Sequence, residues 1–388
     1  MTASRPLLGI AALAALATLA ALAGIALLTL THPPFRSAAA THRISDTDLS
    51  LHLPALDFPS SAASLSPAHH EYYASAAAAD FCAAHGYHVF APRAASGERK
   101  VYDLVMANSE LDFLEIRLST MYDYVDYFVV VESPRTFQGT ARPLTIRNNW
   151  DRFARYHDKM VYHLLEFTPG FAPPLTWDYE NLQRDATFEQ VLPRLEGRAA
   201  PVDGDVLLVA DVDEIPRPAT LLLLRTCAFP RRLTLASRFY YYSFQFLHVG
   251  AEWPHPQATF YEGVDDTVRP SELRGGGGGS AWQRARGADT LGNAGWHCSS
   301  CFETMAQFRN KMASFSHLWM NEERYRDRDH IAAAVRAGRD VWGRSEELFR
   351  RVEGNVDVPP VLLGGEGRRR FGYMLSRDGE SAGFTDYP

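Results

Sequence analysis

Residues 205–216 have the sequence DVLLVADVDEIP, and this stretch decides which class of fold the chain of 388 residues can form. Its apolar run, 206–210, is bounded by acidic residues, a pattern typical of a strand buried on both faces of a sheet. Asp211, Asp213 and Glu214 follow where that strand leaves the sheet. In open α/β sheets ligands bind outside the carboxyl ends of the strands, so we expect these carboxylates to lie in a binding crevice.

The three carboxylates also predict a cation site. Carboxylates this close in the chain repel one another and shift each other's pKa unless a cation lies between them. Hard divalent cations such as Mn²⁺ and Mg²⁺ take oxygen ligands and often share them with the phosphates of a substrate. The alternative interpretation of the same residues is an acidic turn exposed to solvent.

Strand-like and helix-like patterns alternate along the chain from Lys100 onward. Strands are expected over 101–106, 127–131, 160–165 and 205–210, helices over 110–122, 149–156 and 178–195, and further β structure over 233–247. This alternation predicts an α/β fold with a mainly parallel sheet covered by helices on both faces. We expect Tyr240, Tyr241 and Tyr242 to pack within a strand, with a sugar-binding platform as the alternative.

The N-terminal region predicts attachment to a membrane. Residues 7–30 are uncharged and rich in Ala and Leu, long enough to cross a bilayer as a signal anchor, with a cleaved signal peptide as the alternative. Residues 1–6 would form a cytosolic tail and 31–75, dense in Ala, Ser, Pro and His, a flexible stem. The remainder, 76–388, is expected to form one catalytic domain.

Charge, cysteines and glycines set further limits. The net charge of −7 and the lack of a basic stripe exclude a nucleic-acid partner. An even number of cysteines, four, allows disulfides in three connectivities, and the Cys298–Cys301 spacing also fits a redox pair or half of a zinc site. Residues 265–292, which include the run Gly275–Gly279, are expected to form a mobile loop.

Several blocks of the sequence resemble glycosyltransferase family 17, which includes the β-1,4-mannosyl-glycoprotein 4-β-N-acetylglucosaminyltransferases. The blocks follow one another in the family's order between Lys100 and Asn321. They are YDLVMANSELDFLEIRL at 102–118, VES at 131–133, TFQG at 136–139, RPL at 142–144, QRDA at 183–186, DVDEIPRP at 211–218, GWHCS at 295–299 and KMASFSHLWMN at 311–321. Within them, Asp211-Val-Asp213 matches the Asp-x-Asp motif of transferases that use nucleotide sugars.

The resemblance implies a complete set of functional properties. Members of the family are single-pass type II proteins of the Golgi membrane, with a lumenal catalytic domain of GT-A-like fold. The resemblance therefore implies inverting transfer of N-acetylglucosamine from UDP-N-acetylglucosamine to a mannose of a glycoprotein glycan, in β-1,4 linkage. A divalent cation would neutralise the negative charge that grows on the departing diphosphate.

The metal is expected to be held mainly by the acidic motif. Asp213 is the first candidate for direct contact and for a catalytic role, Asp211 would contact the metal or the ribose, and Glu214 would orient the ligands. His317 is the candidate for a third ligand, and His297 is a weaker competitor for the same role. For His317 the alternative is a core or surface histidine without a ligand role.

Donor contacts are expected from the ends of the first strands. Asn108, Glu110 and Glu132 follow those strands and could accept hydrogen bonds from the uracil or the ribose, although Asn108 or Ser109 could instead cap the next helix. Arg184 and Lys311 could pair with the diphosphate. For Arg184 the alternative is a cation on a helix surface.

The general base that inversion requires is not identified by any motif, and Glu303 and Glu252 are the candidates. Glu115 and Arg117 are expected to be structural. Two other classes of protein stay open. A metal-dependent hydrolase of phosphate esters would need a second metal cluster that the sequence does not show, and a membrane-tethered glycan-binding protein would not need the intact acidic motif. A glycosyltransferase that uses a different acceptor or UDP-sugar is also possible.

Overall fold

The computed structural model describes residues 42–50, 73–91, 99–173, 175–278, 287–314 and 318–387. The predicted anchor, 7–30, lies outside these ranges. Among the helices within them, none combines the length and the apolar character that a bilayer span requires.

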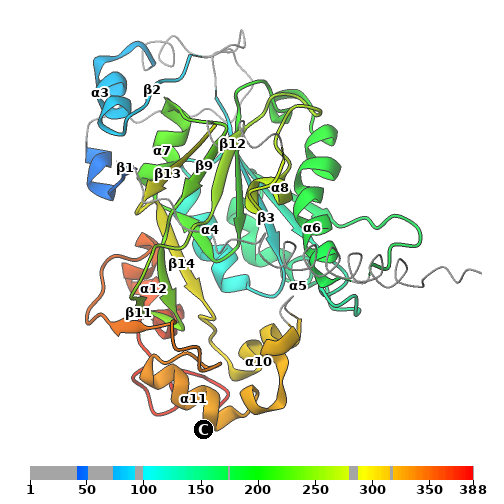
Figure 1. Cartoon of the computed structure of the whole chain (residues 1–388), viewed down its shortest axis with the longest axis vertical. Coiled ribbons are helices and arrows are strands. Elements are labelled where there is room, and N and C mark those ends of the chain that lie inside the picture. The colour runs from blue at the N-terminus through cyan, green and yellow to red at the C-terminus, as the bar shows by residue number, and fades with distance from the viewer. Residues whose placement is uncertain are drawn as a thin grey trace, which may run out of the picture. The chain divides into compact units, whose positions relative to one another are not determined.

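The acidic motif begins at the end of a strand inside a large mixed sheet. Figure 1 shows strands β13, β9, β12 and β3 of this sheet. The strand order is β1-β13-β9-β12-β6-β3-β4-β5. The strands are β1 (His42–Arg43), β3 (Val101–Ala107), β4 (Tyr127–Glu132), β5 (Met160–Leu164), β6 (Val206–Asp211), β9 (Arg232–Leu235), β12 (Gln257–Phe260) and β13 (Ala288–Gly292). Strands β6, β3, β4 and β5 are parallel, as are β9, β13 and β1, and β12 runs antiparallel between the two groups. The expected mainly parallel sheet is therefore confirmed.

Both faces of the parallel strands are covered, because successive side chains of a strand point to opposite faces. Val105 of β3 packs in one apolar cluster with Leu114 of helix α4 (Leu111–Met121). Its neighbour Leu104 packs in another cluster with Phe188, which follows helix α6 (Thr176–Ala186). Continuous apolar strands without polar alternation fit this two-sided burial.

The other helices and short strands complete the described chain. The helices are α3 (Ala76–Ala84), α5 (Thr145–Asn148), α7 (Pro218–Thr226), α8 (Pro270–Arg274), α10 (Met305–Ser314), α11 (Arg328–Ala337) and α12 (Gly365–Arg370), and Trp150–Tyr156 forms a 3-10 helix. A two-stranded sheet pairs β2 (His88–Val89) with β8 (Cys227–Ala228). Helix α8 and strand β13 lie within 265–292, so the prediction of one continuous loop there was wrong. Gly275 follows α8 directly, and 279–286 lie outside the described residues.

The structure also contains a second sheet, which the sequence patterns did not predict. This sheet carries several of the residues that line the candidate site described below. Its order is β15-β11-β10-β14-β7. These strands are β7 (Glu214–Pro216), β10 (Arg238–Tyr241), β11 (Ser243–His248), β14 (Gly295–Ser299) and β15 (Phe349–Arg351). Tyr240 and Tyr241 lie buried in β10, which confirms the prediction for these two residues. Tyr242 is also buried but follows the strand with a positive φ of 64°, so the prediction of a strand was wrong for Tyr242.

Part of the expected stem belongs to the folded body. Strand β1 pairs with β13 at the edge of the large sheet, and Ile44 is buried in the main apolar cluster. The carboxylate of Asp46 lies 2.9 Å from the guanidinium of Arg217. The prediction of a flexible stem over 31–75 was therefore wrong for 42–50, because a two-residue strand and one apolar side chain leave no periodic signal.

All four cysteines form disulfides. Cys82 of α3 is joined to Cys227 of β8, and Cys298 of β14 is joined to Cys301. The first pair links segments 145 residues apart in the sequence. The disulfide between Cys298 and Cys301 rules out the alternative in which their thiolates form half of a zinc site.

Candidate functional site

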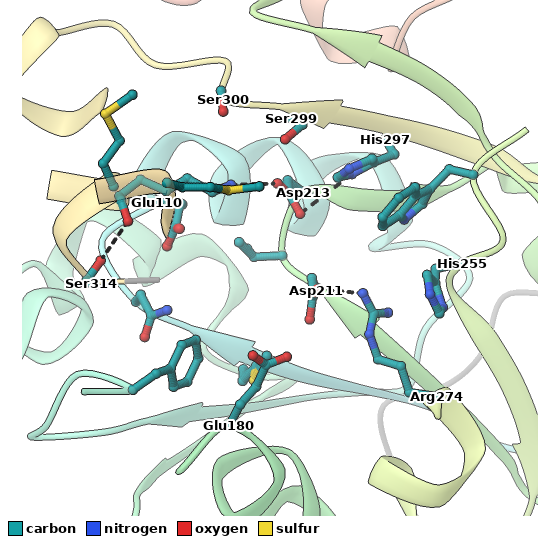
Figure 2. Close-up of a pocket in the computed structure, with 18 of the residues that line it drawn as sticks. Glu110, Glu180, Asp211, Asp213, His255, Arg274, His297, Ser299, Ser300 and Ser314 are labelled. Carbon is teal, nitrogen blue, oxygen red and sulfur yellow. Dashed lines mark hydrogen bonds and ion pairs between the residues drawn. The ribbon is translucent and has the colours of Figure 1, made fainter. Parts of the chain in front are cut away.

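A cavity of about 480 Å³ opens at the carboxyl end of β6, between the two sheets. Figure 2 shows Asp211 and Asp213 facing into it, with Arg274 and His255 on one side and His297 and Ser299 on another. The lining residues from the N-terminal half include Met106, Asn108, Glu110, Phe137, Trp177, Glu180, Asn181 and Arg184. Those from the C-terminal half include Phe239, Tyr241, Ser300, Phe308, Lys311, Trp342, Arg344 and Glu347.

A buried arginine fixes the backbone of the acidic motif. Arg117 of α4 has no exposed surface and pairs with Asp103 of β3, with 2.5 Å between the closest atoms. One of its terminal nitrogens also donates to the backbone carbonyls of Asp211 and Glu214. The turn that carries the carboxylates is thus attached to the helix below it, and the expectation that Arg117 is structural is confirmed.

The carboxylate of Glu214 is fully buried and accepts four hydrogen bonds. Two come from Arg274 at 2.8 and 2.7 Å, one from the indole of Trp253 at 2.7 Å, and one from the backbone amide of Asp211 at 2.9 Å. Burial alone would raise the pKa of Glu214, but the Arg274 guanidinium outweighs it and holds that pKa well below its usual range. Glu214 therefore acts as a charged anchor for its neighbours.

Both oxygens of Asp211 are also engaged. Oδ1 accepts from Arg184 of α6 at 2.9 Å, and Oδ2 accepts from Arg274 at 2.6 Å. Burial raises the pKa of Asp211, but the two arginines outweigh it and leave the pKa below its usual value. Arg184 itself is buried and also pairs with Glu180, which rules out the alternative of a cation on a helix surface.

Asp213 is held much more loosely. Its Oδ2 lies 3.5 Å from Nζ of Lys311, and its Oδ1 lies 3.7 Å from Nδ1 of His297. Both separations exceed the roughly 2.7–2.9 Å of a charge-assisted hydrogen bond. The arrangement therefore presents one loosely held carboxylate beside an amine and an imidazole.

Comparison with known protein families supports the interpretation of the acidic motif as part of a glycosyltransferase site. The sequence profile of glycosyltransferase family 17 matches residues 44–353. The chain belongs to glycosyltransferase family 17. The match begins at Ile44, the buried residue directly after β1, which supports including 42–50 in the folded body.

Three curated relatives share one name. The chain is 28% identical over 276 residues to the beta-1,4-mannosyl-glycoprotein 4-beta-N-acetylglucosaminyltransferases of Homo sapiens, Rattus norvegicus and Mus musculus. The alignment covers 64% of this chain, with 50% of the human protein and 49% of each rodent protein. The chain thus spans about half the length of the curated relatives it matches.

The donor-side predictions have different outcomes in this family 17 structure. Asn108 and Glu110 line the cavity, as does Lys311. Glu132 does not: its oxygens accept from the amides of Ile146 and Arg147 at the start of α5 and from the hydroxyl of Tyr162. The prediction that Glu132 contacts the nucleotide was therefore wrong, because a carboxylate at a strand end can equally satisfy the amides of a nearby helix start.

The expected alternative of an Asn108 or Ser109 helix cap was also wrong. Glu110 occupies the cap position of α4 without a capping side-chain bond, and its Oε2 accepts from the amide of Ser109 at 2.8 Å. The amide oxygen of Asn108 accepts instead from Arg142. Asn108 and Glu110 consequently keep their place on the cavity wall.

Neither candidate base lines the cavity. Glu303 is not among the residues that line the cavity. Burial raises the pKa of its carboxyl, and the Asp112 carboxylate raises that pKa further. Glu252 pairs with Arg43 at 2.6 Å and accepts from the amide of Asn293. The geometry therefore disfavours both as the base. His317 lies outside the described residues.

Three important residues of the site were missed. Arg274 and Trp253 donate hydrogen bonds to Glu214, and burial and the charge of Arg274 lower the pKa of His255. All three residues line the cavity. Arg274 stands directly before the run of glycines, where composition indicates only a loop. Trp253 and His255 occur in a proline-rich segment without a period. A buried carboxylate must be paired with a positive charge. This requirement could have indicated that an additional arginine lies beside the acidic motif.

The donor set suits a divalent cation that also binds phosphate. Among the described residues no three His, Cys, Asp or Glu side chains form a metal cluster. Mg²⁺ sites commonly use one or two carboxylates plus substrate phosphates, so a small number of protein ligands is sufficient. The loosely held Asp213 and the Nδ1 atom of His297, which is buried and has no hydrogen-bond partner in the described part of the chain, fit that role.

Proposed function

We propose that this chain transfers N-acetylglucosamine from UDP-N-acetylglucosamine to a mannose of a glycoprotein N-glycan, in β-1,4 linkage with inversion. Membership of family 17 and the name of the relatives support the class of reaction. The observation that carries the proposal is the loosely held carboxylate of Asp213, which faces the cavity beside Lys311.

The N-terminal half of the cavity would bind the donor nucleotide, and the C-terminal half would bind the acceptor sugar. In the N-terminal half, Asn108, Glu110 and Asn181 offer hydrogen-bonding groups to uracil or ribose, and the exposed ring of Trp177 offers a stacking surface. In the C-terminal half, the ring of Trp342 offers an apolar face of the kind that sugar rings contact.

The diphosphate is expected to lie next to the acidic motif. A divalent cation, Mn²⁺ or Mg²⁺, held by Asp213 would act as a Lewis acid for the departing phosphate. The ammonium of Lys311, which lines the same wall, would add positive charge there. Asp211 and Arg184, which are paired with each other, would shape the wall without neutralising the diphosphate.

Inversion also requires a group that accepts the proton of the attacking hydroxyl. Glu110 and Glu347 are carboxylates on the cavity wall, and Glu347 lies in the half assigned to the acceptor. We propose these two in place of Glu303.

The proposal includes a location. Residues 7–30 would anchor the chain in the Golgi membrane as a single-pass type II protein, with the catalytic body in the lumen. Protection of the body from protease in sealed vesicles, together with an intact N-terminus, would support this. A mature chain that begins after about residue 30 would instead indicate a cleaved signal peptide.

The test is release of UDP from UDP-N-acetylglucosamine with Mn²⁺ and a mannose-containing N-glycan, with the product's linkage read by mass spectrometry and glycosidase digestion. Asp213→Asn keeps the shape of the side chain but removes its charge, so turnover should fall at least about 100-fold, the scale of losing one electrostatic contact to a transition state. Asp265→Asn, the same change on an exposed loop, is the matched control.

Two results would refute parts of the proposal. Full turnover of Asp213→Asn would remove the role of this carboxylate. Lack of sugar transfer from any UDP-sugar by the folded wild type would favour a glycan-binding protein without activity.

A further inference from the structure

Three properties of His297 indicate a ligand role in addition to its packing. It is 6% exposed, its Nδ1 is buried without a hydrogen-bond partner in the described chain, and that atom faces the cavity beside Asp213. A buried polar atom left without a partner costs roughly 1–3 kcal/mol, so its retention in a packed site calls for a partner that binds there.

The imidazole is held in a fixed orientation. Its ring stacks between Phe239, with centroids 5.1 Å apart and planes at 21°, and Trp253, with centroids 4.8 Å apart and planes at 20°. Its strand β14 pairs with β10 on one side and β7 on the other. Rotation of the ring away from Asp213 would break both stacks, so Nδ1 is directed at the carboxylate by packing.

The other carboxylates of the motif are already occupied. Asp211 uses one oxygen for Arg184 and the other for Arg274, and Glu214 accepts four hydrogen bonds. A cation at Asp211 would have to displace a guanidinium from an ion pair of 2.6 or 2.9 Å. The arginines thus direct a cation toward the Asp213 side of the motif.

We propose that Asp213 and Nδ1 of His297 together form the protein's cation site, and that Asp211 is not a metal ligand. This inference rests on the proposed transfer from a nucleotide sugar. Donors to one small cation at about 2.1 Å each can be at most about 4.2 Å apart. The observed separation of 3.7 Å lies within that reach.

The mixed donor set also specifies which cation is preferred. Imidazole suits first-row transition metals, whereas Mg²⁺ prefers oxygen ligands alone. The site should therefore bind Mn²⁺ more tightly than Mg²⁺. The remaining coordination positions would be filled by diphosphate oxygens and water.

The experiment measures Mn²⁺ binding to the full chain, with and without UDP, from the loss of the six-line electron paramagnetic resonance signal of free Mn²⁺. His297→Phe keeps an aromatic ring between Phe239 and Trp253 but removes both nitrogens. Loss of a side chain that only supports a metal ligand lowers metal affinity roughly 10- to 100-fold. Loss of the ligand itself should therefore lower Mn²⁺ affinity by at least this factor. His297→Asn, whose amide oxygen can replace Nδ1, should recover part of the affinity and narrow the preference for Mn²⁺ over Mg²⁺.

His248→Phe is the matched control. His248 packs against the same Phe239 ring, with centroids 5.2 Å apart, but does not line the cavity. Its Mn²⁺ affinity should equal that of the wild type. Asp211→Asn should lower Mn²⁺ affinity much less than Asp213→Asn does.

Two results would overturn the inference. Unchanged Mn²⁺ binding by folded His297→Phe, with loss in His317→Ala, would assign the nitrogen ligand to His317. If wild type with UDP bound no Mn²⁺ yet transferred sugar in excess chelator, the cation site would be refuted while the transferase function stood. Conversely, Mn²⁺ binding that depends on His297 without any sugar transfer would support the site and refute the function.

Discussion

Replacement of Glu214 by glutamine tests the electrostatic core of the site. The glutamine keeps the size of the side chain, but its amide nitrogen cannot accept a hydrogen bond. Each oxygen of Glu214 accepts one bond from Arg274 and one from either Trp253 or Asp211. In either orientation of the amide, two donors would therefore face an NH₂ group.

The expected loss can be estimated from this geometry. Breaking a buried ion pair by removing one partner destabilises a protein by about 3–5 kcal/mol. Arg274 would keep its contact with Asp211 at 2.6 Å, so we expect the lower end, a loss of about 3 kcal/mol. At about 2 °C per kcal/mol for a body of this size, Tm should fall by about 6 °C.

The assay is thermal and urea unfolding of the single mutants and of the double mutant Glu214→Gln/Arg274→Met. Because the two side chains share one ion pair, the double mutant should be more stable than the sum of the single losses predicts, by about 1 kcal/mol or more. Glu166→Gln, the same change in the exposed pair with Arg194, should leave stability nearly unchanged. An unaltered Tm in Glu214→Gln, or strict additivity in the double mutant, would refute the reasoning.

Three further predictions concern pH, a disulfide and a loop. Burial and the Arg274 charge lower the pKa of His255 from 6.5 to about 4, so the unfolded chain binds more protons between these values. Stability should therefore fall by up to about 3 kcal/mol as pH drops from 6.5 to 4, and urea titrations of His255→Gln should lack this part of the loss. Removing the Cys82–Cys227 disulfide, by alanine at both positions, should cost about 2–5 kcal/mol in the same titrations, because it closes a long loop; a smaller loss would indicate a compact unfolded state. Deleting two glycines from 275–279 should leave Tm nearly unchanged, and steady-state kinetics should show a larger change in KM for the acceptor than for the donor; equal changes would indicate an inert insertion.

The strands and helices of the N-terminal half could be predicted because each carries a strong local pattern. The apolar run 206–210 forms β6, and the periodic helix over 110–122 forms α4 at 111–121. Burial on both faces of the sheet leaves these runs without polar interruptions, so local sequence is sufficient.

The contacts of individual side chains could not be predicted in the same way. Glu132 and Asn108 both follow strands, yet Glu132 binds the start of α5 while Asn108 lines the cavity. Local sequence does not show which groups the fold brings to a carboxylate. Arg274 is 60 residues from Glu214, and the bonds from Ser271 to Asp185 help to anchor α8 where the Arg274 guanidinium enters the site.

The register between β14 and β7 limits how the family can change by insertion and deletion. His297 lies opposite Glu214, and Gly295 lies opposite Pro216, where a Cβ atom would come within 2.6 Å of the carbonyl oxygen of Ile215. One added residue between Gly295 and His297 would turn the imidazole to the other face of the sheet. Length variation should therefore accumulate after Gly275, where surface loops tolerate it, while the three residues from Gly295 to His297 keep a constant length in every active member.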